Sequence, residues 1–142
     1  RGSDVTLIGI SWMAAESLRA AAILEREGIE AEVIDLRSLK PWDRDTVVAS
    51  VMRTGRAVVA DSGWRTAGAA AEIAAEVSEQ AFGALHAPIA RVTLPDVPAP
   101  SSRIEEQAYY PGAEQIADAA RRVRAWGVRE RSSVARAVRG AA

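Results

Sequence analysis

The order of apolar and polar residues along the chain predicts strands that alternate with helices. Four short apolar runs, rich in β-branched residues, have the pattern of strands buried on both faces, and they span residues 5–10, 31–36, 56–60 and 88–94. Four longer stretches repeat apolar residues at helical spacing, over residues 13–27, 45–53, 66–82 and 113–123. We therefore expect an α/β fold with a mainly parallel sheet and helices on both of its faces.

The predicted helices have recognisable ends and faces. Asp43 stands where an N-cap is expected before the second helix, and Gly55 stands where that helix should end. In the first helix one face should be buried, and it carries Ala14, Leu18, Ala21, Ala22 and Leu24. The opposite face should be solvated, and it carries Glu16, Arg19, Arg26 and Glu27.

Length and composition indicate one ordinary globular domain. The chain has 142 residues, of which 49% are hydrophobic and 26% charged, and its net charge is −1. It contains no cysteine, which excludes disulfides and thiolate metal sites. No run approaches 18 apolar residues, and residues 1–4 lack the apolar core of a signal peptide. We expect a cytoplasmic protein with no membrane or nucleic-acid partner.

The charge of the chain is unevenly distributed. Residues 121–142 contain seven arginines and one glutamate, a balance of +6, so the preceding residues carry −7. Few large apolar side chains remain after residue 126 to offset the entropy of ordering. We expect a domain over residues 1–126 and a solvated basic tail over residues 127–142. Docking of the tail on an acidic partner and weak nucleic-acid contact are the alternatives.

The loops after the predicted strands are the places to look for a site, because an open parallel sheet binds ligands at the carboxyl ends of its strands. The loop after the third strand contains a carboxylate, a hydroxyl, an indole and a guanidinium just where a helix is expected to begin. Its residues are Asp61, Ser62, Gly63, Trp64, Arg65 and Thr66. Since a helix start attracts anions, this segment is a candidate anion or partner site. Alternatively, Asp61 and Ser62 satisfy backbone donors, Gly63 permits the turn and Trp64 packs.

A proline-rich segment follows the fourth strand. Its prolines restrict the backbone, so residues 95–100 form either a rigid crossover or a preformed docking loop. Two adjacent tyrosines follow it, and tryptophan, tyrosine and arginine are enriched at interface hot spots. The predicted subunit interface is Trp64, Arg65, Pro95, Asp96, Pro98, Pro100, Tyr109 and Tyr110.

Residues for catalysis are not evident. His86 is the only histidine, which excludes a metal site with two histidines, and we expect it to be exposed or packed in a loop. Ser62 is not part of a nucleophile elbow, because no glycine stands two residues before it. The glycines at 63 and 68 lack the spacing of a dinucleotide fingerprint. We assign no catalytic, cofactor-binding or metal-binding residue.

Five segments carry a family resemblance in order and spacing: residues 33–43, 51–66, 71–75, 87–92 and 95–100. They resemble the C-terminal domain of transketolase-like, thiamine-diphosphate-dependent enzymes. The similarity is greatest to the beta subunit of the decarboxylating component of 2-oxoacid (pyruvate or branched-chain) dehydrogenases, and it covers residues 3–124.

The resemblance implies a three-layer α/β/α sandwich whose mixed sheet has about five strands, one edge strand running against the others. It also implies an assembly and regulatory domain, in a homodimer or heterotetramer. The implied partners are the alpha subunit and the pyrimidine-binding domain of the same enzyme, with a lipoyl acyltransferase as a further partner. The holoenzyme would use thiamine diphosphate and magnesium for oxidative decarboxylation of a 2-oxoacid.

Relatives hold the cofactor's magnesium-bound diphosphate with a Gly-Asp-Gly motif and a downstream asparagine. This chain has no Gly-Asp-Gly sequence and no asparagine, so we expect it to bind no cofactor alone. Two alternatives remain. One is a stand-alone α/β domain that binds a small anion or nucleotide, and the other is the C-terminal part of a split transketolase.

Overall fold

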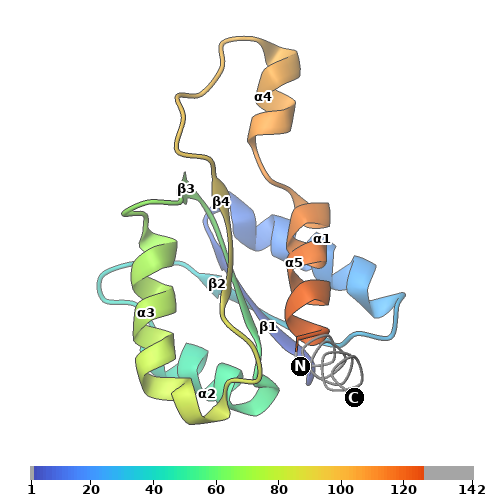
Figure 1. The fold of residues 1–142 in the computed structure, drawn as a ribbon, viewed down its shortest axis with the longest axis vertical. Coiled ribbons are helices and arrows are strands. Elements are labelled where there is room, and N and C mark those ends of the chain that lie inside the picture. The colour runs from blue at the N-terminus through green and yellow to red at the C-terminus, as the bar shows by residue number, and fades with distance from the viewer. Residues whose placement is uncertain (1, 127–142) are drawn as a thin grey trace, which may run out of the picture.

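The structure, a computed structural model, describes residues 2–126 (Figure 1). In order, the elements are β1 (Val5–Ile10), α1 (Trp12–Glu25), β2 (Ala31–Leu36), α2 (Arg44–Thr54), β3 (Ala57–Trp64), α3 (Ala69–Ala81), a 3₁₀ turn (Phe82–Ala84), β4 (Ala90–Leu94), α4 (Arg103–Tyr109) and α5 (Ala113–Arg124). Every predicted strand and helix is present, although several ends differ. The predicted basic tail lies outside the described residues.

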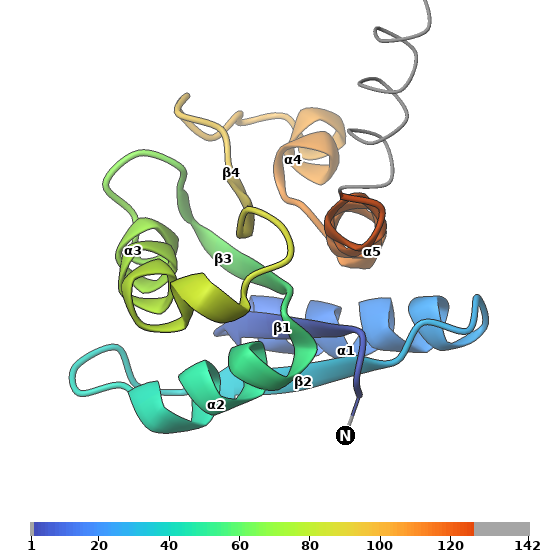
Figure 2. The same ribbon diagram turned by 60° about the horizontal axis from the view of Figure 1, so that its bottom comes forward.

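The four strands form one parallel sheet in the order β2-β1-β3-β4. Helices α1 and α5 cover one face, and α2 and α3 cover the other, as Figures 1 and 2 show. The three-layer α/β/α prediction is therefore confirmed. Within residues 2–126 the sheet has one strand fewer than expected, and the strand expected to run against the others is not among them.

Neighbouring residues of the central strands point to opposite faces, which gives the domain two cores. Leu7 and Val58 pack beneath α1 and α5, whereas Ile8 and Val59 pack beneath α2 and α3. Small residues dominate the buried side of α5, namely Ala117, Ala119 and Ala120. Their lack of bulk lets this helix contact both the sheet and α1.

The predicted ends of α2 are confirmed. The Asp43 side chain accepts a hydrogen bond from the backbone N–H of Thr46 at 3.1 Å, as an N-cap does. Gly55 follows the helix with a φ of 66°, the left-handed conformation that favours glycine.

The predicted faces of α1 are wrong at three positions. Glu16, expected in solvent, is buried, whereas Leu18 and Ala22, expected in the core, are exposed, Leu18 by 62%. The reason is that α1 packs against α5 as well as against the sheet. A Glu16 carboxylate oxygen accepts the backbone N–H of Ala113 at 2.9 Å, at the positive start of α5. Just after α1, the two carboxylate oxygens of Glu27 accept hydrogen bonds from Nε and Nη2 of the Arg121 guanidinium on α5.

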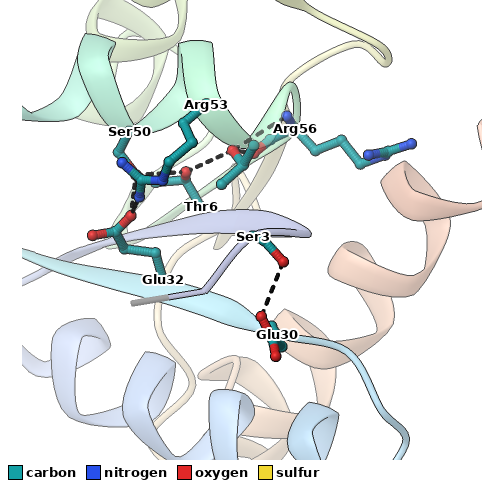
Figure 3. Close-up of polar contacts among 8 residues, drawn as sticks. Ser3, Thr6, Glu30, Glu32, Ser50, Arg53 and Arg56 are labelled. Carbon is teal, nitrogen blue, oxygen red and sulfur yellow. Dashed lines mark hydrogen bonds and ion pairs between the residues drawn. The ribbon is translucent and has the colours of Figure 1, made fainter.

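A polar network joins α2 to the sheet (Figure 3). The hydroxyl of Thr6, on the buried strand β1, shares hydrogen bonds with Ser50 at 2.9 Å and Thr54 at 2.8 Å. Ser50 also donates to Glu32 at 2.9 Å, and Glu32 pairs with Arg53. Because each buried hydroxyl has partners, the network offsets the cost of placing polar groups between two layers.

Helix α4 was not predicted. Its seven residues stand away from the sheet at the top of Figure 1, and only Tyr109 is buried. A helix that faces no core has no apolar stripe, so periodicity gives no signal for it. No helix within residues 2–126 combines the length and apolarity needed to cross a bilayer.

Candidate functional site

The Asp61 side chain holds the connection between β3 and α3 by accepting hydrogen bonds from its backbone. It is buried, one carboxylate oxygen accepts the N–H of Gly63 at 3.0 Å, and the other accepts the N–H of Ala70 at 3.3 Å. Strand β3 continues to Trp64 and α3 begins at Ala69, so the expected helix start near residue 66 is wrong. Asp61 therefore satisfies backbone donors of this connection, including one in the first turn of α3.

The turn between the two elements requires a residue without a side chain. A β-carbon at Gly68 would collide with the carbonyl oxygen of Trp64. Ala67, just before it, has a φ of 57°. This tight turn explains why the chain needs residues 65–68 before it can start a helix, which the apolar periodicity did not show.

Trp64 and Tyr109 meet across the loops, although 45 residues separate them in sequence. The Trp64 indole N–H donates to the Tyr109 hydroxyl at 3.3 Å, and that hydroxyl donates to the carbonyl of Val97 at 2.9 Å. Tyr109 is therefore buried, contrary to the expectation that both tyrosines would offer free surface. Tyr110 is exposed and its ring stands edge-on to that of Tyr109, with 5.2 Å between centroids.

Two sets of hydrogen bonds join the loop after β3 to its neighbours: one set reaches β4, and the other reaches the loop after β4. The Arg65 and Arg91 guanidiniums each donate to the other residue's backbone carbonyl, at 3.4 and 3.0 Å. The Asp96 carboxylate accepts the N–H of Thr66 at 3.0 Å and its hydroxyl at 2.7 Å. The structure thus brings together the two segments that the sequence singled out. Their polar groups are largely engaged with one another.

Hydrogen bonds from the side chain and backbone of Thr66, helped by the charge of Arg65, lower the pKa of Asp96 from its ordinary value of 3.8. A carboxyl whose pKa is lower in the folded state stabilises the fold above the unfolded value, and this contribution is lost as the pH falls through the folded value. We expect Asp96→Asn to lower stability near pH 7 and to become indistinguishable from the parent chain in strong acid. Urea unfolding between pH 7 and pH 2 measures this, and a difference independent of pH would contradict it.

Large apolar side chains are exposed mainly at the carboxyl ends of the strands. Ten are exposed within residues 2–126, and six lie in this region: Trp12, Leu39, Trp64, Val97, Ile104 and Tyr110. We name these six residues the carboxyl-end surface. The interface predicted from sequence includes Trp64 and Tyr110 because aromatic residues are frequent at interfaces. Trp12, Leu39, Val97 and Ile104 were missed, since only burial distinguishes an exposed apolar residue from a core one.

Asp61 and Asp96, the aspartates near the carboxyl ends of β3 and β4, offer little to a magnesium diphosphate group. Both Asp61 oxygens and both Asp96 oxygens already accept hydrogen bonds within the chain. Within residues 2–126 no three histidine, cysteine or acidic residues are grouped so that they could hold a metal ion. His86 lies elsewhere, exposed and with its ring against Gly55, so it packs in a loop.

Comparison with known proteins gives concordant matches. The model of the family "Transketolase, C-terminal domain" matches residues 1–116. The beta subunit of acetoin:2,6-dichlorophenolindophenol oxidoreductase of Cupriavidus necator is 49% identical over 121 residues, which are 85% of this chain and 36% of that protein. The pyruvate dehydrogenase E1 component subunit beta of Bacillus subtilis is 43% identical over 122 residues, 86% of this chain and 37% of that protein.

A solved structure described as a split gene transketolase, in the form of an inactive beta4 tetramer, has the same fold. It superposes with a TM-score of 0.73 at 32% sequence identity, over 87% of this chain and 40% of that one. The chain thus spans little more than a third of the length of the two curated relatives. The family match, the identity to these relatives and the shared sheet agree, and the chain belongs to the family of transketolase C-terminal domains.

Proposed function

We propose that this chain is the C-terminal assembly and regulatory domain of the beta subunit of a thiamine-diphosphate-dependent 2-oxoacid dehydrogenase. The observation that carries the proposal is the carboxyl-end surface, where six of the ten exposed large apolar side chains within residues 2–126 gather. Exposed apolar patches in soluble proteins mark contact sites, and tryptophan and tyrosine are frequent at their centres. On this proposal, the domain supplies a surface that contacts other parts of the enzyme.

The partners follow from the relatives. The relatives of Cupriavidus necator and Bacillus subtilis are each named as the beta subunit of a larger enzyme, and the split transketolase is described as a beta4 tetramer. We infer that the carboxyl-end surface packs against a second copy of this chain or against the alpha subunit and pyrimidine-binding domain, in a homodimer or heterotetramer. A lipoyl acyltransferase would be a further partner, and the complex would act in the cytoplasm.

The chemistry belongs to the holoenzyme. Thiamine diphosphate with magnesium would supply the electron sink for decarboxylation, and the residues at the carboxyl ends here would exclude water and position loops rather than react. We expect isothermal calorimetry with thiamine diphosphate and magnesium to show no heat with this chain alone. Saturable binding at micromolar cofactor would contradict the assignment. The carboxylate oxygens of Asp61 and Asp96, which could otherwise be metal ligands, already accept hydrogen bonds within the chain.

The proposal is tested by reconstitution. The chain is mixed with the cofactor-binding region and the alpha subunit of the proposed enzyme, and 2-oxoacid decarboxylation is followed by reduction of an artificial electron acceptor. We expect no turnover from either part alone and turnover from the mixture. Turnover that is the same with and without this chain would overturn the proposal.

A second candidate is the C-terminal part of a split transketolase. The solved split transketolase, which superposes at a TM-score of 0.73, favours it. The two candidates differ in substrate, so the same reconstituted mixture is offered a ketose phosphate with an aldose acceptor in place of a 2-oxoacid. Transfer of a two-carbon unit without 2-oxoacid turnover would select the split transketolase.

A further inference from the structure

Glu16 is a buried carboxylate that lies between α1 and the start of α5. Its Oε2 accepts the backbone N–H of Ala113 at 2.9 Å, and its Oε1 pairs with the Arg19 guanidinium. Arg19 in turn lies over the ring of Trp12, a residue of the carboxyl-end surface, at 5.7 Å from the ring centroid. Because both oxygens of Glu16 have partners, its charge is compensated although the residue is only 7% exposed.

The start of α5 depends on Glu16 because the N-cap residue of this helix, Gly112, has no side chain. The first N–H groups of a helix have no partner within the helix, and the side chain of the N-cap residue usually accepts one of them. Here the accepting oxygen comes from a residue 97 positions away in sequence. Its negative charge also faces the positive end of the helix dipole. Glu16 therefore fixes the point at which the chain enters α5.

Residues 101–112, which we call the α4 arm, contain α4 and stand away from the sheet (Figure 1). Tyr109 is the only buried residue of the arm, and the next buried residue along the chain is Ile116. Between these two, the only hydrogen bond from the described chain to another part of the fold is the bond that Ala113 donates to Glu16. The arm is therefore held at two points, at Tyr109 and directly after its last residue.

We propose that Glu16 is a positioning residue that anchors the α4 arm and so keeps Ile104 and Tyr110 in place on the carboxyl-end surface. A helix of seven residues is marginal in water by itself, so the order of α4 depends on how its two ends are held. Tyr109 holds one attachment through its hydroxyl, and Glu16 holds the other. An arm fixed in advance loses less entropy when a partner contacts it. Only this benefit rests on the proposed function; the anchor itself does not.

Hydrogen exchange of the 142-residue chain tests the anchor without any partner or cofactor. The N–H groups of Glu106 and Tyr110 are bonded within α4 and report on the order of the arm. We expect Glu16→Leu to speed their exchange by about tenfold or more, while the N–H groups of β1 and β3 keep their rates. Glu16→Gln keeps an accepting oxygen but loses the charge, and should speed exchange less in the same region. Glu25→Leu is the matched control, because Glu25 is exposed at the other end of α1, and it should change neither region.

A second change separates anchoring of the arm from simple capping of α5. Gly112→Ser supplies an N-cap side chain, and a β-carbon there would come no closer than 3.4 Å to the Glu16 carboxylate. Added to Glu16→Leu, it should restore slow exchange in the first turns of α5 but leave α4 fast, because serine does not tie the chain to α1. Recovery of both regions would mean that Glu16 only caps α5, and the proposal would be overturned.

Two further results would also overturn the proposal. Exchange that quickens equally in every element would show that Glu16 supports the whole fold, and unchanged exchange in α4 would show that Tyr109 holds the arm by itself. If Glu16→Leu does not fold, Glu16→Gln decides by the same regional comparison. These measurements use the free chain, so their failure leaves the reconstitution test of the proposed function unaffected.

Discussion

Replacing Gly9 by alanine is expected to destabilise the domain by about 3 kcal/mol or more, because overpacking against backbone cannot be relieved by a side-chain rotation. A β-carbon at this position would lie 2.5 Å from the Cα of Ala14 and 2.8 Å from the carbonyl oxygen of Met13. Gly9 lies in the central strand β1, where it pairs with both β2 and β3. Helix α1 would have to move away from the sheet and open the core beneath it.

Urea or thermal unfolding of Gly9→Ala measures the effect, and we expect the midpoint temperature to fall by about 10 °C. Gly83→Ala is the matched control, because a β-carbon there meets no atom within 4 Å. This control should leave the midpoint unchanged or raise it slightly, since alanine reduces the freedom of the unfolded chain. A Gly9→Ala variant as stable as the Gly83→Ala control would show that α1 does not approach β1 as closely as described.

Truncating Trp64 to alanine is expected to weaken association of the chain with itself or its partner subunit by roughly 2 kcal/mol, about thirtyfold in dissociation constant. The side chain is 57% exposed, so its removal takes little from the core of the isolated domain. It does remove the hydrogen bond to Tyr109. Trp64→Phe separates the two effects, because phenylalanine keeps a large ring and loses only the N–H donor; it should retain most of the association.

Sedimentation equilibrium over a range of concentrations measures the dissociation constant for each variant. Leu18→Ala is the control, because Leu18 is as exposed as Trp64 but lies on α1, outside the carboxyl-end surface. It should associate like the parent chain. A monomeric parent chain at high concentration, or a Trp64→Ala variant that unfolds without a change in association, would assign Trp64 to packing and not to an interface.

The candidate site was predicted from sequence in its components but not in its geometry. Loop position and residue type drew attention to Trp64, Arg65 and the segment 95–100, and the structure brings these parts together through the contact of Thr66 with Asp96. The sequence could not show that the polar groups satisfy one another. Hydrogen bonds between residues 30 positions apart leave no periodic trace.

The sequence by itself determined the alternation of strands and helices, the cap at Asp43 and the glycine end at Gly55, because these depend on side chains within a few residues of one another. Tertiary structure alone decided that Glu16 is buried under the start of α5 and that Leu18 is exposed. It also decided that β3 runs on to Trp64 and that α4 stands clear of the sheet. Local pattern encodes which residues prefer burial, whereas the neighbour that buries a residue, or leaves it exposed, comes from distant parts of the chain.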